Sequence, residues 1–370
     1  MRTASWLASL GLAAATLLTL AAGAPIPIVQ VLDLSGPNGD TGKDFLTGAQ
    51  VYFDKLNSRG GLRGRPLKLI VADDAGKPAN TVALSRKLVT EHKPVAMFAY
   101  FGAENVRAVL ADASLRREGL PMVAPLVGVE LANADPVFYL RASLADEMAR
   151  IARFAAGSGF KRIALVVGDD AQGSAAAQAI ATGLRSNQLV LSGTAVLNSE
   201  ASNVEQAAAT LLRTQPQAVL LAAPTIASAA FVQAYQRQQP GTAFYAVAGI
   251  NPQTLREFLG GEAARWVAVS ALVPSPYNPT TPLAREFVAT LKQYRDEPPS
   301  HSSLEGFAAA KLLVSALEQA GDISPGGLRA ALEKLRTDLG GLPLRLDGDN
   351  RRASRYGDMA VISADGKLVN

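Results

Sequence analysis

Residues 162–170, Arg-Ile-Ala-Leu-Val-Val-Gly-Asp-Asp, carry the pattern that most directly indicates the fold. The first six residues form a nearly uninterrupted apolar run, and a glycine and two acidic residues follow it. A strand with one face in solvent alternates apolar and polar side chains, whereas a strand of a parallel sheet covered on both faces is apolar throughout. Residues 162–167 are therefore predicted to form a buried strand of an α/β sheet.

Short strand-like runs and helical stretches alternate on both sides of this strand. Further strands are predicted at residues 28–32, 67–72, 95–100, 122–124, 190–196, 218–222, 244–247 and 267–270. Helices are predicted at residues 45–56, 81–92, 106–115 and 146–156, the first of them ended by Gly60-Gly61. Strands that alternate with helices imply parallel pairing, with helices on both faces of the sheet. The chain therefore divides into two similar α/β halves.

Prolines mark the end of the second half, at positions 274, 276 and 279. Two longer helices are predicted after them, at residues 283–294 and 304–320, and short strands at 343–346 and 358–362. A chain of 370 residues is long enough for two domains with their own cores.

The first residues have the pattern of a secretory signal peptide. Arg2 provides a positive charge, Trp6 to Leu20 is almost wholly apolar, and Ala21-Ala22-Gly23-Ala24 offers small residues for cleavage. A membrane anchor is the alternative, although the apolar run is short for a bilayer span of about 20 residues. We therefore expect residues 1–24 to be removed and the mature protein to lie in the periplasm. The chain has no cysteine, which excludes a lipid-modified cysteine anchor.

Residue types that carry catalysis or bind metals are scarce. The chain has two histidines and no cysteine, so a transition-metal site is not expected, and no cofactor motif is present. His301 is expected in a surface loop. The acidic pairs Asp73-Asp74 and Asp169-Asp170 end strands, where turn and helix-capping roles fit them better than acid–base catalysis. An enzyme is therefore not expected.

The charge pattern gives no sign of a polyanion partner. The net charge is +4, and the basic residues are interspersed with acidic ones. Even the densest basic run, Arg351-Arg352 with Arg355, has Asp349 and Asp358 nearby and is expected to be a solvated loop. No nucleic-acid partner is expected.

A series of motifs, in order, resembles the type I periplasmic binding proteins, in particular the leucine/isoleucine/valine-binding-like family of ABC importers. These motifs are Asp33-Leu34-Ser35-Gly36-Pro37, residues 57–65 with their Gly60-Gly61 turn, Asp73-Asp74, Gly119-Leu120-Pro121, residues 168–173 and Leu304-Glu305-Gly306-Phe307. No single motif is specific, but together they span the mature chain. The resemblance implies a solute-binding subunit, a permease in the membrane as its partner, and a monomer.

The resemblance also implies an α/β fold of two doubly wound, Rossmann-like lobes joined by a three-segment hinge. The first lobe would contain residues 25–140 plus 274–343, and the second would contain residues 141–273 plus 344–370. In open parallel sheets, ligands bind beyond the carboxyl ends of the strands, where the strand order reverses. We therefore expect a small-molecule site in a cleft between the lobes. Hinge closure would bury the ligand.

The loops that follow the predicted strands give the candidate wall of this cleft. Its residues are Ser35, Thr41, Tyr100, Phe101, Ala103, Asn105, Leu126, Val127, Gly128, Asp170, Gln172, Thr225, Ala248, Asn251 and Glu305. For each of them, ordinary turn chemistry is the alternative role.

The family's amino-acid-specific groups are largely absent from these positions. The resemblance places Gly128 where amino-acid binders carry a threonine, Gln172 and Pro224 where they carry tyrosines, and Ala248 where they carry a glutamate for the ligand ammonium group. We therefore expect poor binding of branched-chain amino acids, unless Asp170, Glu104 or Glu305 supplies a carboxylate.

The expected ligand is instead a carboxylate or amide with an aromatic or aliphatic body. Two other readings remain open: a sensor that delivers its ligand to a membrane receptor or kinase, and a secreted α/β enzyme.

Overall fold

The computed structural model describes residues 23–129, 131, 135–169, 171–198, 200–347, 349–363 and 368–369. The predicted signal peptide lies outside these residues, apart from Gly23 and Ala24. In the described part of the chain, no helix is both long and apolar enough to cross a membrane.

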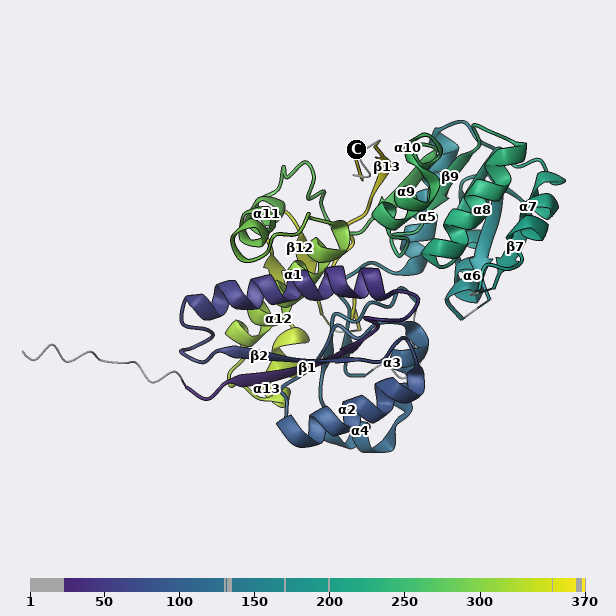
Figure 1. Cartoon of the computed structure of the whole chain (residues 1–370). Coiled ribbons are helices and arrows are strands. Elements are labelled where there is room, and N and C mark those ends of the chain that lie inside the picture. Colours follow the sequence, from purple (N-terminus) through teal and green to yellow (C-terminus); the bar gives the residue numbers. More distant parts are fainter. Residues whose placement is uncertain are drawn as a thin grey trace, which may run out of the picture.

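The chain forms two α/β lobes (Figure 1). The first contains a parallel sheet of the order β2-β1-β3-β4-β5. Its strands are β1 (Ile26–Leu32), β2 (Leu67–Asp73), β3 (Met97–Phe98), β4 (Met122–Val123) and β5 (Val137–Phe138). Its helices are α1 (Gly39–Ser58), α2 (Pro78–His92), α3 (Ala103–Ala111) and α4 (Ala113–Glu118).

The second lobe repeats this order in β7-β6-β8-β9-β10, and these strands are again parallel. It adds β13, which is antiparallel to β10, and β14, which is antiparallel to β13. Its strands are β6 (Arg162–Gly168), β7 (Val190–Leu197), β8 (Ala218–Ala222), β9 (Ala243–Ala246), β10 (Val267–Ala271), β13 (Asp358–Ile362) and β14 (Leu368–Val369). Its helices are α5 (Leu144–Gly157), α6 (Ala171–Ser186), α7 (Val204–Leu212), α8 (Thr225–Gln238), α9 (Pro252–Leu259) and α10 (Gly261–Ala264). Residues 163–168 of β6 are fully buried, as the apolar run predicted.

A segment after the second lobe returns to the first. It contains α11 (Pro282–Tyr294), α12 (His301–Gln319), α13 (Pro325–Leu332), β11 (Arg336–Asp338) and β12 (Pro343–Arg345). Leu344 and Leu346 are buried in the same core as Phe45 of α1 and Phe307 of α12. Residues 139–143, between β5 and α5, form the first crossing from one lobe to the other. The chain later runs back beside this crossing, where the Ala353 N–H donates to the Tyr139 carbonyl at 2.9 Å.

Helices α1 and α12 pack closely enough that only glycine fits at two positions. A Cβ at Gly48 would lie 1.7 Å from the Ser303 carbonyl oxygen, and one at Gly306 would lie 1.9 Å from the Phe45 carbonyl oxygen. Because both contacts are with backbone atoms, a side chain there would force the helices apart. This glycine contact joins the return segment to the first lobe.

Three local predictions are wrong. The helix predicted at 106–115 is divided into α3 and α4, because the Asp112 side chain accepts from the Ser114 and Leu115 N–H groups and starts a new helix. The strand predicted at 95–100 is reduced to β3, since Ala99 after it has a φ of 52°. His301 is not in a surface loop: it opens α12, and both of its ring nitrogens are buried.

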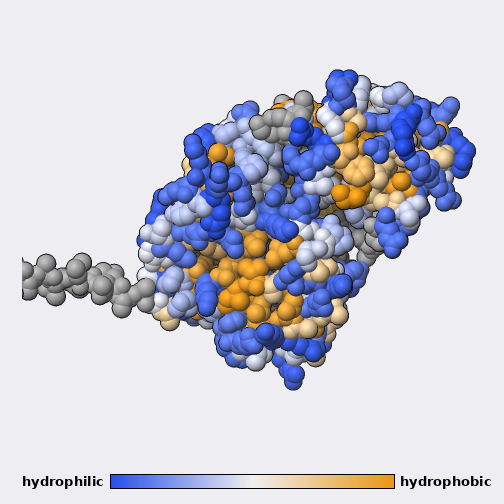
Figure 2. Space-filling model, viewed as in Figure 1, coloured by the Kyte–Doolittle hydropathy of each residue, from blue (hydrophilic) through white to orange (hydrophobic). Residues whose placement is uncertain are grey.

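The first sheet leaves its edge strand partly uncovered. Leu69, Ile70, Val71 and Ala72 of β2 are half-buried. Figure 2 shows an apolar area over β1 and β2 on this face.

Candidate functional site

A cavity of about 340 Å³ lies between the lobes, at the carboxyl ends of the strands. The first lobe lines it with the loops after β1, β2, β3 and β4, and the second lobe with the loops after β8 and β9 and the start of α5. The strand order reverses beside β1 in one sheet and beside β6 in the other, so each lobe presents its switch point to the cleft. This volume suits a small organic molecule.

Buried carboxylates fix the turns on the first-lobe side. Asp33, after β1, accepts from the Gly36 N–H at 2.6 Å and from the Asn38 N–H at 3.0 Å. Asp74, after β2, accepts from the Thr81 hydroxyl at 2.7 Å and from the Asn105 amide at 3.1 Å. Burial raises the pKa of Asp74, and the Thr81 hydrogen bond opposes that rise. Both carboxylates therefore stabilise loops, and for Asp74 this agrees with the turn chemistry predicted for Asp73-Asp74.

Helix α3 presents its N-terminus to the cavity. Gly102, at its N-cap, has a φ of 90°, which glycine adopts without steric cost. The next three residues, Ala103, Glu104 and Asn105, line the cavity. The first N–H groups of a helix have no carbonyl partner within the helix and attract electronegative atoms. This end of the cavity can therefore receive an oxygen of a ligand.

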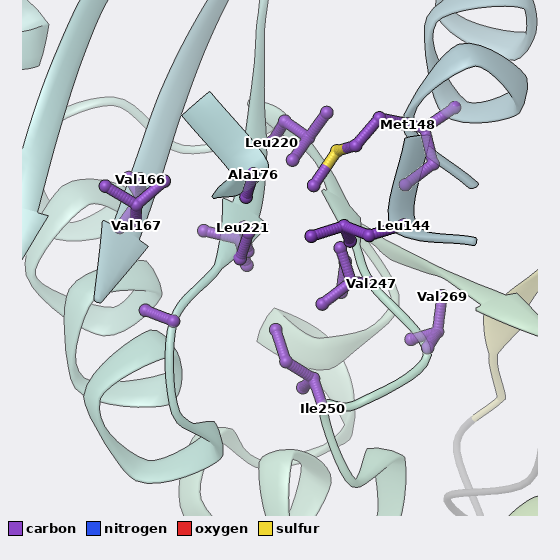
Figure 3. Packing of buried hydrophobic residues seen from close by; sticks show 14 of the residues in the cluster. Leu144, Met148, Val166, Val167, Ala176, Leu220, Leu221, Val247, Ile250 and Val269 are labelled. Carbon is purple, nitrogen blue, oxygen red and sulfur yellow. The ribbon is translucent and has the colours of Figure 1, made fainter. Parts of the chain in front are cut away.

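The middle of the cavity is apolar. Phe101 and Leu126 line it from the first lobe, where the two residues form a parallel bridge. Leu144, Val247 and Pro224 line it from the second lobe. Figure 3 shows Leu144 from α5 close to Val247, which follows β9, within the buried cluster of the second lobe. These side chains suit an aliphatic or aromatic group.

Charged residues lie where the first crossing enters the cavity. Arg141 donates to both Glu305 carboxylate oxygens, at 2.8 and 2.7 Å, so the crossing is tied to α12 of the first lobe. Glu147, in the first turn of α5, lines the same cavity and accepts from the Ala248 N–H at 2.6 Å. Burial raises the pKa of Glu147, whereas the Ala248 N–H opposes the rise.

The structure brings some of the predicted site residues together. Those on the cavity wall are Phe101, Ala103, Asn105, Leu126 and Gly128. Others have structural contacts: the Tyr100 hydroxyl is buried against Ser85, Thr225 accepts from the Asn251 N–H, and Asn251 caps α9. Ser35 is exposed beside Asp73, and Thr41 is buried in α1.

The remaining predicted residues that the structure describes are not on the cavity wall. Val127 is buried in the core, Ala248 contributes its N–H to Glu147, and Glu305 is held by Arg141. Gln172 belongs to α6, and Asp170 lies outside the described residues.

Sequence reasoning missed Arg141, Leu144 and Glu147 as cavity residues. They lie between β5 and the first turns of α5, on the segment that passes from one lobe to the other, whereas the predicted wall was drawn from the other post-strand loops. A usable signal was present, because Glu147 is an acidic residue within the apolar stripe formed by Leu144, Met148 and Ile151.

A second cavity, of about 470 Å³, lies beside the first and third crossings and outside the cleft. Arg351 and Arg352 line it and lie over the rings of Phe138 and Tyr139, at 4.7 and 4.1 Å from the ring centroids. The basic run 351–352 is therefore half-buried packing at the crossings rather than the solvated loop that was predicted. Within the described ranges, no group of three or more His, Asp or Glu residues could hold a metal ion.

Comparison with known proteins connects this geometry to a family. The family described as "Periplasmic binding protein" matches residues 25–367. A substrate-binding periplasmic protein from Ralstonia solanacearum has 29% identity and a TM-score of 0.86, over 93% of this chain and 99% of that one. A possible leucine/isoleucine/valine-binding protein from Rhodopirellula baltica has 26% identity and a TM-score of 0.86, over 95% of this chain and 98% of that one.

Curated relatives match over a shorter stretch. An "Amino acid binding protein" from Pseudomonas aeruginosa is 34% identical over 67 residues, which is 18% of this chain and 18% of that protein. The chain therefore aligns with about 18% of the length of the curated relatives it matches. The match of residues 25–367, together with the two lobes and the order of the motifs, means that the chain belongs to the periplasmic binding proteins, in their type I, leucine/isoleucine/valine-binding-like branch.

Proposed function

We propose that this protein captures a small organic molecule outside the cytoplasm and delivers it to an ABC permease. The observation that carries the proposal is the cavity at the switch points of both lobes, with helix α3 at one end and an apolar middle. The mature chain would begin near Ala24 or Pro25 and act as a monomer without a cofactor, and it would not be an enzyme.

The proposed ligand is a carboxylate or amide with an aromatic or aliphatic body. The N–H groups at the start of α3 would receive its oxygen, and Phe101, Leu126 and Val247 would contact its apolar body. Branched-chain amino acids fit this wall less well, because Gly128 offers no hydroxyl and Pro224 no phenol. Isothermal titration with leucine tests this point, and a micromolar Kd would contradict it.

Binding would involve closure of the lobes about the three crossings. We propose the first two lobe boundaries, after residue 140 and after residue 273, as the sequence predicted them. The burial of Leu344 and Leu346 with α12 favours a third crossing near residues 351–357, rather than at 343.

The direct test is mass spectrometry of the small molecule released from gently purified protein. We expect one compound below about 500 Da, the size that a cavity of a few hundred Å³ accepts. Co-purification with a permease would distinguish transport from delivery to a sensor kinase. Protein that releases no compound, and that no candidate ligand stabilises, would contradict the proposal.

A further inference from the structure

Glu147 differs from the other carboxylates that line the cleft cavity. Asp33 accepts two backbone N–H groups of its own loop. Glu104 is half-exposed and pairs with Arg107 at 2.5 Å. Glu147 is only 5% exposed, yet it lines the cavity. Its carboxylate accepts from the Ala248 N–H and lies beside the Ser270 hydroxyl, and its two oxygens have capacity for further donors.

The positive charge nearest to this site is already paired. Arg141 lines the cavity, but its guanidinium donates two parallel hydrogen bonds to Glu305, which belongs to the opposite lobe. Such bidentate pairs are strong and geometrically fixed. A ligand carboxylate that approached Arg141 would therefore meet a guanidinium whose charge Glu305 already balances, and it would meet the Glu147 carboxylate at the same end of the cavity.

The second-lobe end of the cavity thus favours hydrogen-bond donors over acceptors. We propose that Glu147 is the specificity-determining acceptor for an N–H group of the ligand, so that the ligand is a primary amide or an amine with an apolar body. This inference rests on the proposed function and changes its ligand class: the amide fits, a simple carboxylate does not, and an amine joins the class because it also supplies an N–H group. A buried acceptor left without a donor also rejects ligands that cannot supply one.

The location of Glu147 links binding to closure. Its helix starts directly after the first crossing, and its Oε1 holds the Ala248 amide in the loop after β9. The start of α3, on the other lobe, lines the same cavity. A ligand that donates an N–H to Glu147 and packs its apolar body against Phe101 and Leu126 would contact both lobes at once.

A matched chemical panel tests this proposal. Each of several aryl and alkyl bodies would be offered as its primary amide, its ammonium form, its carboxylate and its methyl ester, for example phenylacetamide, 2-phenylethylammonium, phenylacetate and methyl phenylacetate. Thermal stabilisation would rank the compounds, and isothermal titration would give the affinities of the best pairs. We expect amides or amines to bind at least tenfold more tightly than the matching carboxylates and esters.

The substitution Glu147→Gln then identifies the acceptor. Glutamine keeps an oxygen for the Ala248 N–H but loses the charge, so we expect at least a tenfold loss of affinity for the best amine or amide. Glu147→Asp, which keeps the charge on a shorter side chain, should lose affinity less than Glu147→Gln does for an amine. Glu205→Gln is the matched control, because Glu205 also lies in the first turn of a second-lobe helix but is exposed at the surface.

The results distinguish a failure of the proposed Glu147 role from a failure of the proposed function. Binding by carboxylates alone, or an amine affinity that Glu147→Gln changes by less than twofold in a folded variant, would overturn the role of Glu147 and leave capture of a small molecule standing. A panel with no binder in any class would contradict the proposed function itself, and this inference with it.

Discussion

The two lobes share one strand order but hold it together differently. Sheet β2-β1-β3-β4-β5 contains three strands of only two residues, whereas β6 and β7 of the second sheet have seven and eight residues. The first lobe compensates with the close packing of α1 on α12, with buried polar groups such as Asp74, and with the Arg141–Glu305 pair that ties the first crossing to α12. Equal topology therefore does not imply equal sensitivity to substitution.

The cleft has the same asymmetry. The first-lobe wall presents backbone amides and turn-stabilising carboxylates. Among the residues that the structure describes, the second-lobe wall presents Ala222, Ala223, Pro224 and Val247 around the buried carboxylate of Glu147. A repeated fold has thus produced two walls of different chemistry, which is what recognition of an asymmetric ligand needs.

The largest effect is expected from breaking the ion pair at the first crossing. Arg141→Met leaves Glu305 without its partner while both positions stay largely buried, so we expect a loss of about 3–5 kcal/mol in the free energy of unfolding. Urea denaturation measures it. The exposed pair of the second lobe is the control: Arg237→Met, which frees Glu205, should cost less than about 1 kcal/mol. Equal losses in the two variants would remove the distinction between the lobes.

Helix packing provides the second test. Gly306→Ala places a Cβ 1.9 Å from a backbone oxygen of α1, and we expect a loss of about 3 kcal/mol or more. Gly183→Ala in α6 places its Cβ 3.1 Å from the Ala149 Cα, and the higher helix propensity of alanine offsets part of that strain. We therefore expect Gly183→Ala to change stability by less than about 1 kcal/mol. Thermal and urea unfolding of both variants should agree in this order, and a tolerated Gly306→Ala would contradict the packing argument.

Acid stability gives the third and smallest effect. Burial lowers the pKa of His301 to about 4, from 6.5 in an unfolded chain. The folded state therefore keeps the ring neutral, and stability present above about pH 6.5 is lost as the pH falls towards 4. By linkage this amounts to about 2 kcal/mol between pH 7 and 4.5. In the His301→Leu variant the corresponding part of the pH dependence should be absent; an unchanged pH profile would mean that the ring is solvated.

Much of the fold was predictable because burial and periodicity act locally. The apolar run at 162–167 and the strands at 67–72 and 218–222 depend on residues close in sequence, and the structure places strands at each of them. The break at Asp112 and the short β3 depend on a cap and on a left-handed Ala99, which a count of apolar positions does not detect.

The site was predictable only in part, for a physical reason. Phe101, Ala103 and Leu126 follow strands, and parallel strands bring such loops to one edge. Arg141 and Glu147 reach the cavity through the crossing between lobes, whose path depends on contacts with distant residues such as Glu305 and Ala248. Pairings over such separations in sequence are set by tertiary packing, which one sequence does not contain.

The central claim is that two lobes close around a small molecule held in the cleft. Small-angle scattering of the protein, alone and with a saturating amount of the compound that it releases, tests this claim most directly. We expect a smaller radius of gyration in the complex, a mass that corresponds to a monomer, and stabilisation by about 4 kcal/mol when the ligand concentration is a thousand times Kd. An unchanged radius of gyration at verified saturation would contradict closure.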